Sequence, residues 1–182
     1  MAAKIFWVTG PWRGRLGIVP RPRGAEWLDD ETRAWREAGI DLVVSLLETD
    51  EEADLDLTGE STSSKNNGIA FRAFPIPDRR APSSREAVAE LADQIIDALS
   101  SGKTVVVHCR QSIGRSTMVV AAVLLAGGLD AETAVNAIRQ SRGLDVPETQ
   151  AQRQWISDFS AWLSSRRAAQ QQHPAGGASR RG

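Results

Sequence analysis

The chain has 182 residues, of which 41% are hydrophobic and 25% are charged, an ordinary composition for one globular domain with a buried core. A formal net charge of -1 excludes a broad positive field for binding nucleic acid or an anionic membrane, and a single cysteine excludes an internal disulfide, a CxxC redox pair and a zinc site built from thiolates. The N-terminal sequence MAAKIFWVTG does not resemble a signal peptide and no apolar run approaches ~18 residues, so we expect a cytoplasmic protein with no membrane insertion, no metal and no cofactor.

The first part of the chain predicts a strand pair, a helix and a buried strand, in that order. Residues 4–19 contain two short apolar runs separated by glycine and proline, which is typical of a hairpin. Residues 27–38 place apolar side chains at helical spacing, and Gly39 ends the run as a C-terminal glycine would. The nearly continuous apolar run at residues 41–47 (DLVVSLL) then predicts a strand buried on both faces of a sheet.

The next segment is polar, and we expect no chemistry from it. Residues 49–57 are acidic with apolar side chains at spacings that predict a short helix, and residues 59–68 (GESTSSKNNG) predict a polar turn. A further strand is expected at residues 69–76 (IAFRAFPI), where Pro77 ends it.

The second half of the chain predicts one more strand and further helices. Ser83 or Ser84 can cap a helix that carries a single apolar stripe. Residues 104–107 predict an apolar strand. The helix that begins at Arg115 is apolar nearly all round, which places it in the middle of the fold.

The chain ends with two helices and a polar segment. The helices are predicted at residues 131–140 and about 149–163. Residues 166–182 (RRAAQQQHPAGGASRRG) lack apolar content, so we assign residues 1–165 to a single domain and expect a disordered tail after it. Since strands alternate with helices, the pattern predicts an α/β fold with a central, mainly parallel sheet of about five strands flanked by helices.

One stretch, residues 104–117 (TVVVHCRQSIGRST), joins a buried strand to a helix through a short loop. Such a loop can point its backbone N–H groups inward, and the helix adds the positive end of its dipole, so amides bind a phosphate dianion. The planar guanidinium of Arg115 can hold two phosphoryl oxygens at once, which a lysine cannot match. The predicted phosphate-binding residues are Arg110, Gln111, Ser112, Ile113, Gly114 and Arg115.

The same electrostatics act on Cys109, whose sulfur would lie at the base of the loop. Because main-chain donors and a helix N-terminus surround it, the thiol is expected to be ionised at neutral pH. The thiolate can attack phosphorus and form a cysteinyl-phosphate intermediate, which divides hydrolysis into two easier steps. Ser116 can donate its hydroxyl to the sulfur when it leaves in the second step, and His108 is expected to orient the loop rather than transfer protons.

The sequence HCRQSIGRST resembles the HCxxGxxR[ST] signature of the protein-tyrosine and dual-specificity phosphatase superfamily. The resemblance implies a compact, dual-specificity-like phosphatase domain at residues 1–165. Ser112 departs from the signature, because it stands where the pattern has glycine, and if the position needs a positive φ a serine costs on the order of 1 kcal/mol. The alternative function is therefore a catalytically weak or inactive module that binds phosphate or a phosphoprotein.

Other enzymes share part of this motif. Low-molecular-weight phosphatases and arsenate reductases also use a cysteine and an arginine separated by five residues, but near the N-terminus and usually with further cysteines, whereas Cys109 is the single cysteine of this chain. A rhodanese-like sulfurtransferase would not need a general acid. The resemblance to protein phosphatases therefore carries more weight than either alternative.

The resemblance also implies a general acid on a loop roughly thirty residues before the cysteine. Asp78 fits, because it lies in FPIPDRRAPS directly after a predicted strand, at the sheet edge where this class of fold places its site. The other interpretation is an ordinary turn aspartate beside proline. Arg79 and Arg80 either attract acidic substrates or are solvated loop charges.

Further downstream, RGLDVPETQAQRQWI resembles the loop that positions the hydrolytic water, in which two glutamines lie four residues apart. These positions are Glu148 and Gln152 here, so Gln152 is the candidate, with a surface glutamine on a helix as the alternative.

The substrate is predicted to be a phosphoprotein that carries phosphotyrosine and/or phosphoserine/threonine. The phosphate loop contains no lysine, unlike the lysine-rich loops of phosphoinositide phosphatases. Short recognition segments indicate a shallow cleft, which favours dual specificity.

Overall fold

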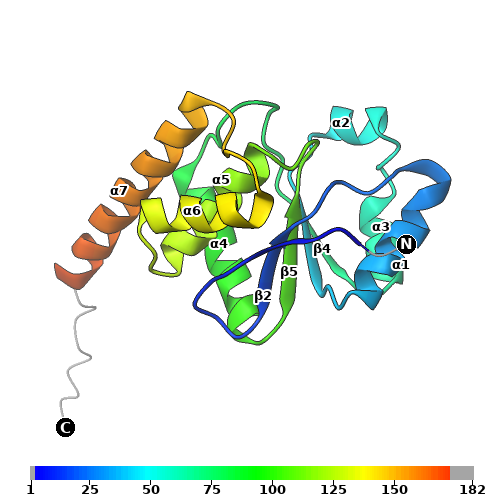
Figure 1. The fold of residues 1–182 in the computed structure, drawn as a ribbon, viewed down its shortest axis with the longest axis horizontal. Helices are drawn as coiled ribbons and strands as arrows, with labels where there is room; N and C mark the ends of the chain where they lie inside the picture. The colour runs from blue at the N-terminus through cyan, green and yellow to red at the C-terminus, as the bar shows by residue number, and fades with distance from the viewer. Residues whose placement is uncertain (1–2, 173–182) are drawn as a thin grey trace, which may run out of the picture.

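The computed structural model describes residues 3–172, which are built around one sheet of five strands (Figure 1). The strands are β1 (Phe6–Val8), β2 (Arg15–Ile18), β3 (Leu42–Ser45), β4 (Ala70–Ala73) and β5 (Thr104–His108). They lie in the order β1-β2-β5-β3-β4. Only β1 and β2 pair antiparallel, so the N-terminal strand pair and the mainly parallel sheet are both confirmed.

The central strand β5 fixes the edge of the sheet at which the site lies. All of its residues are buried, and it pairs with β2 on one side and β3 on the other. The pairing continues past the strand ends, since the N–H of Val19 donates to Val107 O at 3.1 Å and that of Leu46 donates to His108 O at 3.0 Å. Because these parallel strands end together, the loops that follow them meet at one edge, where α/β folds place their sites.

Helices cover both faces of the sheet (Figure 1). They are α1 (Leu28–Glu37), α2 (Thr49–Asp54), α3 (Glu60–Asn66), α4 (Arg85–Ser100), α5 (Arg115–Ala126), α6 (Ala131–Arg142) and α7 (Gln150–Gln172), with a 3-10 turn at Ala25–Trp27. Residues of α4 to α7 form the larger core together with Val105 and Val107 of β5, whereas Val106 packs with Trp35 of α1 in a second core. Alternate residues of β5 thus face different layers, as the pleat of a strand requires.

The helix α5 is buried from Arg115 through Leu125, as the sequence predicts. It lies between α4, α6 and α7 and also contacts β2 and β5, so helices and sheet together exclude water from it. Arg115, the first residue of α5, therefore lies at the buried end of the loop that joins β5 to α5.

The polar turn expected at residues 59–68 is wrong, because Glu60–Asn66 is the helix α3. Its sequence is poor in strong helix formers, and tertiary contacts stabilise it instead. The Ser63 and Thr32 hydroxyl oxygens lie 2.8 Å apart, and the Asn67 side-chain amide donates to Asp29 Oδ1 at 2.9 Å. These contacts join α3 to α1, and sequence periodicity does not reveal them.

The helix α7 continues through Gln172, so the first part of the tail expected at residues 166–182 is helical. Alanine, glutamine and arginine are good helix formers, and the Arg167 guanidinium donates to Ala126 O at 2.6 Å at the C-terminal end of α5. The rest of the expected tail, residues 173–182, lies outside the described residues.

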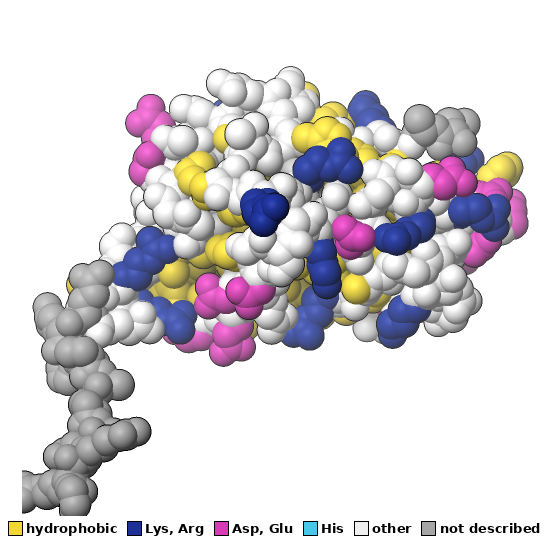
Figure 2. All heavy atoms as spheres, turned by 90° about the horizontal axis from the view of Figure 1, so that it is seen from below, with side chains coloured by type: hydrophobic (Ala, Val, Ile, Leu, Met, Phe, Trp, Pro, Cys, Tyr) yellow, Lys and Arg dark blue, Asp and Glu magenta, His cyan; other side chains and the backbone are white. Residues whose placement is uncertain are grey.

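The surface seen from below carries positive and negative side chains mixed with one another (Figure 2). This mixture on one face agrees with a formal net charge of -1. Within residues 3–172, no helix combines the length and the apolar character needed to cross a membrane.

Candidate active site

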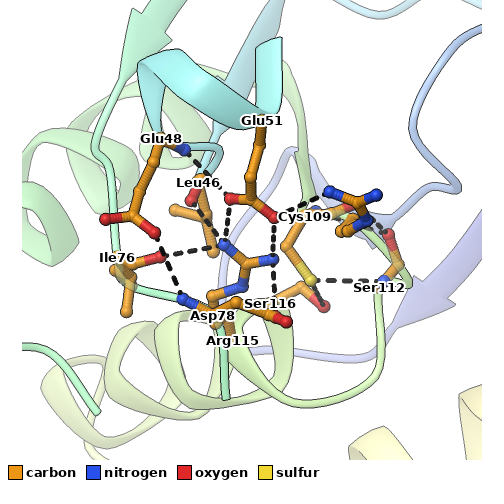
Figure 3. Close-up of polar contacts among 10 residues, drawn as sticks. Leu46, Glu48, Glu51, Ile76, Asp78, Cys109, Ser112, Arg115 and Ser116 are labelled. Carbon is orange, nitrogen blue, oxygen red and sulfur yellow. Dashed lines mark hydrogen bonds and ion pairs between the residues drawn. The ribbon is translucent and has the colours of Figure 1, made fainter. Parts of the chain in front are cut away.

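The loop between β5 and α5 brings the predicted nucleophile and its neighbours together (Figure 3). Cys109 is 3% exposed, and its sulfur accepts a hydrogen bond from the N–H of Ser112 at 3.2 Å. The Ser116 hydroxyl oxygen, from the first turn of α5, lies 3.8 Å from the same sulfur. The sulfur thus lies inside the loop, beside a main-chain donor and a hydroxyl.

Arg115 opens α5 and points across the loop towards α2 and the strand ends (Figure 3). The two Nη atoms lie 2.6 and 2.8 Å from the two carboxylate oxygens of Glu51. Nη1 also donates to Ile76 O at 2.9 Å. Burial alone lowers the pKa of Arg115, but the hydrogen bonds with Glu51 and the attraction of Cys109 raise it above its usual value, so this buried guanidinium stays charged.

Glu51 is a site residue that the sequence reasoning missed. It lies in the first turn of α2, and its side chain accepts a hydrogen bond from the N–H of Glu48 at 3.1 Å. Burial acts to raise the pKa of Glu51, yet the hydrogen bonds from Arg115 and from the Glu48 backbone lower it overall. An acidic residue soon after the buried strand β3, at the same edge of the sheet as Cys109, was the available signal.

Asp78 lies on the loop after β4, and the structure brings it to the same guanidinium. Its Oδ1 is 3.0 Å from Arg115 Nη2, while its own N–H donates to Glu48 Oε2 at 3.3 Å. The Asp78 side chain is 55% exposed, so it stands at the open side of the site. Arg79 follows it with a positive φ of 57°.

A pocket opens over the loop. Its lining consists of Asp78, Arg79, Cys109, Arg110, Gln111, Gly114, Arg115, Glu148 and Gln152. Two of the predicted phosphate-binding residues are not among them, since Ile113 packs against the larger core and the Ser112 side chain is buried. In the predicted phosphate binding, these two residues can therefore take part only through their main-chain N–H groups.

Gln152 lies in α7, and it is buried against the loop rather than on the helix surface. A Cβ atom built on Gly114 would come within 2.5 Å of Gln152 Nε2, so a larger residue in this position would displace the Gln152 side chain. Gln152 Oε1 accepts a 3.4 Å hydrogen bond from the N–H of Thr149, whereas its Nε2 has no hydrogen-bond partner among the described residues. Glu148, the other position of the predicted pair, lines the same pocket.

His108 faces away from the thiol, into the second core. Its Nε2 lies 2.7 Å from Glu60 Oε1, and both side chains are almost fully buried. The Trp35 ring packs nearby, with its centroid 6.0 Å from that of His108. Glu60 comes from α3, which was expected to be a turn, so sequence reasoning also missed this partner.

Ser112 has a φ of 55°, in the left-handed region that favours glycine. The backbone conformation is therefore the one for which the signature has glycine, and this chain adopts it with a serine.

Comparisons with known proteins agree with this geometry. A family model described as "Polymorphic toxin system, DSP-PTPase phosphatase" matches residues 18–129, more than half of the chain. The protein "Cyclin-dependent kinase inhibitor 3" of Rattus norvegicus is 29% identical over 105 residues, which are 54% of this chain and 49% of that protein. The chain thus spans about half the length of the curated relatives it matches.

Solved structures of phosphatases share the fold. Kinase associated phosphatase, solved with its catalytic-site cysteine replaced by serine, superposes with a TM-score of 0.83 at 19% identity, covering 91% of this chain and 98% of that chain. The active form of Tk-PTP has a TM-score of 0.67 at 31% identity, covering 81% and 92%. The extent of the family match and the loop that carries Cys109 and Arg115 lead to the same conclusion: this chain belongs to the DSP-PTPase family of dual-specificity and tyrosine phosphatases.

Proposed function

We propose that this chain hydrolyses phosphate monoesters through a cysteinyl-phosphate intermediate on Cys109. The observation that supports it best is the shared pocket of the Cys109 sulfur, the Arg115 guanidinium and the Asp78 carboxyl group. A nucleophile, a bidentate phosphate binder and a proton donor are the three groups that this reaction needs.

In the first step the Cys109 thiolate attacks phosphorus, so that a P–S bond forms while the P–O bond to the leaving group breaks. The backbone N–H groups of the loop and Arg115 stabilise the charge on the phosphoryl oxygens. Asp78 donates its proton to the departing oxygen, which leaves as an alcohol or phenol. Its place at the open side of the pocket, 3.0 Å from Arg115, suits this role.

In the second step water attacks phosphorus, the P–S bond breaks, and inorganic phosphate leaves. Asp78, now ionised, takes the proton from that water. Gln152 can orient the water, because its amide nitrogen is buried at the pocket without a partner among the described residues. The hydroxyl of Ser116, 3.8 Å from the sulfur, stabilises the thiolate as it leaves.

The proposed substrates are phosphoproteins that carry phosphotyrosine and/or phosphoserine/threonine. The name of one structural neighbour, kinase associated phosphatase, fits this class. The charged residues Arg79 and Arg110 at the pocket suit a substrate with acidic neighbours. A cytoplasmic location is part of the proposal, since a reducing compartment keeps a catalytic thiol in its reduced form.

The second candidate is a module that binds phosphate or a phosphoprotein with weak or no turnover. The positive φ at Ser112 favours it, because a strained residue in the loop can misplace the amides. The two functions differ in turnover alone, so a rate measurement separates them.

The test is hydrolysis of para-nitrophenyl phosphate by the purified chain, compared with Cys109→Ser. Activity that is lost in Cys109→Ser supports the enzyme, whereas tight binding of phosphopeptides without turnover supports the module. The covalent intermediate is tested with a ³²P-labelled substrate and an acid quench. The wild-type protein should retain ³²P, and Cys109→Ser should not. A panel of phosphopeptides, phosphoinositides and nucleotides then identifies the substrate class.

A further inference from the structure

Ser112 brings a strained backbone and an additional hydrogen bond to the same point of the phosphate loop. Its φ of 55° is favourable for glycine and unfavourable for serine. Its side chain is buried, and the hydroxyl donates to the carbonyl oxygen of Val19 at 2.5 Å. A glycine in this position would have no group to make that bond.

We propose that Ser112 is a positioning residue, whose hydroxyl ties the phosphate loop to the end of β2 and thereby holds the Ser112 N–H on the Cys109 sulfur. The inference rests on the proposed function of Cys109 as the nucleophile. It reverses the expectation from the signature, because the serine that departs from it stabilises the active arrangement of the loop.

The acceptor of this hydrogen bond is itself firmly held. Val19 is fully buried and follows directly on β2. Its N–H donates to Val107 O at 3.1 Å, which extends the pairing of β2 with β5. The loop is therefore fixed at three places: at Cys109, where β5 ends, at Arg115, where α5 begins, and at Ser112 between them.

The hydroxyl and the N–H of Ser112 make separate hydrogen bonds with Cys109. The hydroxyl oxygen lies 3.4 Å from the N–H of Cys109, which donates to it, while the Ser112 N–H donates to the Cys109 sulfur at 3.2 Å. Rotation of Ser112 out of the left-handed region would turn its N–H away from the sulfur. The hydrogen bond to Val19 opposes that rotation, so the Ser112 side chain keeps the Ser112 N–H on the Cys109 sulfur.

Two substitutions separate strain from the hydrogen bond. Ser112→Gly relieves the backbone strain and removes the bond, so the loop can adopt the conformation but is not held in it. Ser112→Ala removes the bond and retains the strain, so the loop is expected to leave the conformation. Ser101→Ala is the matched control, since the exposed Ser101 hydroxyl also donates to a carbonyl, Asp97 O at 2.8 Å, but lies before β5, at the opposite end of that strand from Cys109.

The experiment measures the rate at which iodoacetamide alkylates the protein as a function of pH, by intact mass. Cys109 is the only cysteine of the chain, so the rate reports a single thiol. We expect the midpoint of the profile to rise by about one pH unit in Ser112→Ala, the size of one hydrogen bond to a charged group, and by less in Ser112→Gly. Ser101→Ala should coincide with the wild type, and kcat/KM should fall by about tenfold in Ser112→Ala because the nucleophile and the amides lose their alignment.

Midpoints that coincide with the wild type in both folded Ser112 variants would overturn the proposal, as would a midpoint of Ser112→Gly at or below that of the wild type. Circular dichroism checks folding, and if Ser112→Ala does not fold, Ser112→Gly decides alone. Alkylation requires no turnover. A protein that fails to hydrolyse para-nitrophenyl phosphate yet shows the expected order of midpoints would refute the proposed function and leave the role of Ser112 standing.

Discussion

Glu51 and Arg115 face each other with both carboxylate oxygens on the guanidinium, at 2.6 and 2.8 Å, although they are 64 residues apart in the chain. Both side chains are largely removed from solvent, with exposures of 2% for Arg115 and 10% for Glu51, and each charge compensates the other. Glu51 thus fixes the plane of the Arg115 guanidinium, which is the proposed phosphate binder.

Replacing Glu51 by glutamine should lower both stability and activity. The substitution keeps the shape of the side chain but leaves the Arg115 charge without its bidentate partner, so the free energy of unfolding should fall by about 3 kcal/mol. We expect kcat/KM to fall by roughly tenfold to a hundredfold, because the guanidinium is no longer held in one plane. Urea unfolding and para-nitrophenyl phosphate kinetics measure the two effects, with Glu90→Gln on the exposed side of α4 as the control.

The pH dependence of stability should show the opposite shifts of two neighbouring glutamates. The pKa of Glu51 lies below its ordinary value of 4.5 in the folded protein, so its contribution to stability is complete above about pH 4.5 and is lost as the pH falls through the lower, folded value. Burial, followed by the charge of Glu60, raises the pKa of Glu52 above 4.5, so ionised Glu52 opposes folding at higher pH.

Between pH 3 and pH 7, the deficit of Glu51→Gln relative to the wild type should therefore grow with pH, whereas Glu52→Gln should become more stable than the wild type. Chemical unfolding at a series of pH values measures both. A difference that stays constant with pH in both variants would contradict the assignment of these shifts.

Removal of the Asp78 carboxyl group should affect substrates according to their leaving groups. Asp78→Asn should cost alkyl phosphates about 10²-fold to 10⁴-fold in kcat/KM, since an alkoxide needs a proton to depart, and nitrophenyl phosphate much less. Kinetics with a phosphoserine peptide and with para-nitrophenyl phosphate measure the difference. Equal losses on the two substrates would rule out Asp78 as the general acid.

The buried pair of Glu60 and His108 should be coupled in stability. Glu60→Ala leaves the His108 ring without its 2.7 Å partner in the second core and should cost about 1–3 kcal/mol, the cost of a buried polar group without a partner. The same substitution in a protein that already carries His108→Asn should cost much less. A double-mutant cycle by urea unfolding measures the coupling, and additive effects would show that the two side chains do not depend on each other.

The sequence predicts best those features that depend on residues close to one another in the chain. Cys109, Ser112, Arg115 and Ser116 lie in the loop after β5 and in the first turn of α5, so their spacing in the sequence is enough to predict that they lie close together. The alternation of apolar strands and helices likewise predicted the α/β sheet, because buried strands and amphipathic helices have distinct periods.

The missed features depend on distant contacts. Glu51 and Glu60 reach Arg115 and His108 only because β3 lies beside β5 in the sheet and brings the segments after both strands to one edge. The helix α3 was missed for a related reason, since its polar side chains are stabilised by bonds to α1. Neither pairing has a periodic signal in the sequence.

The start of the short helix α2 contacts both the proposed proton donor and the proposed phosphate binder. Glu48, at its start, accepts the N–H of Asp78, and Glu51, in its first turn, pairs with Arg115. A displacement of this turn would therefore move Asp78 and Arg115 together, so a ligand that touches only the outer side of α2 is expected to change the rate of the proposed reaction without entering the pocket.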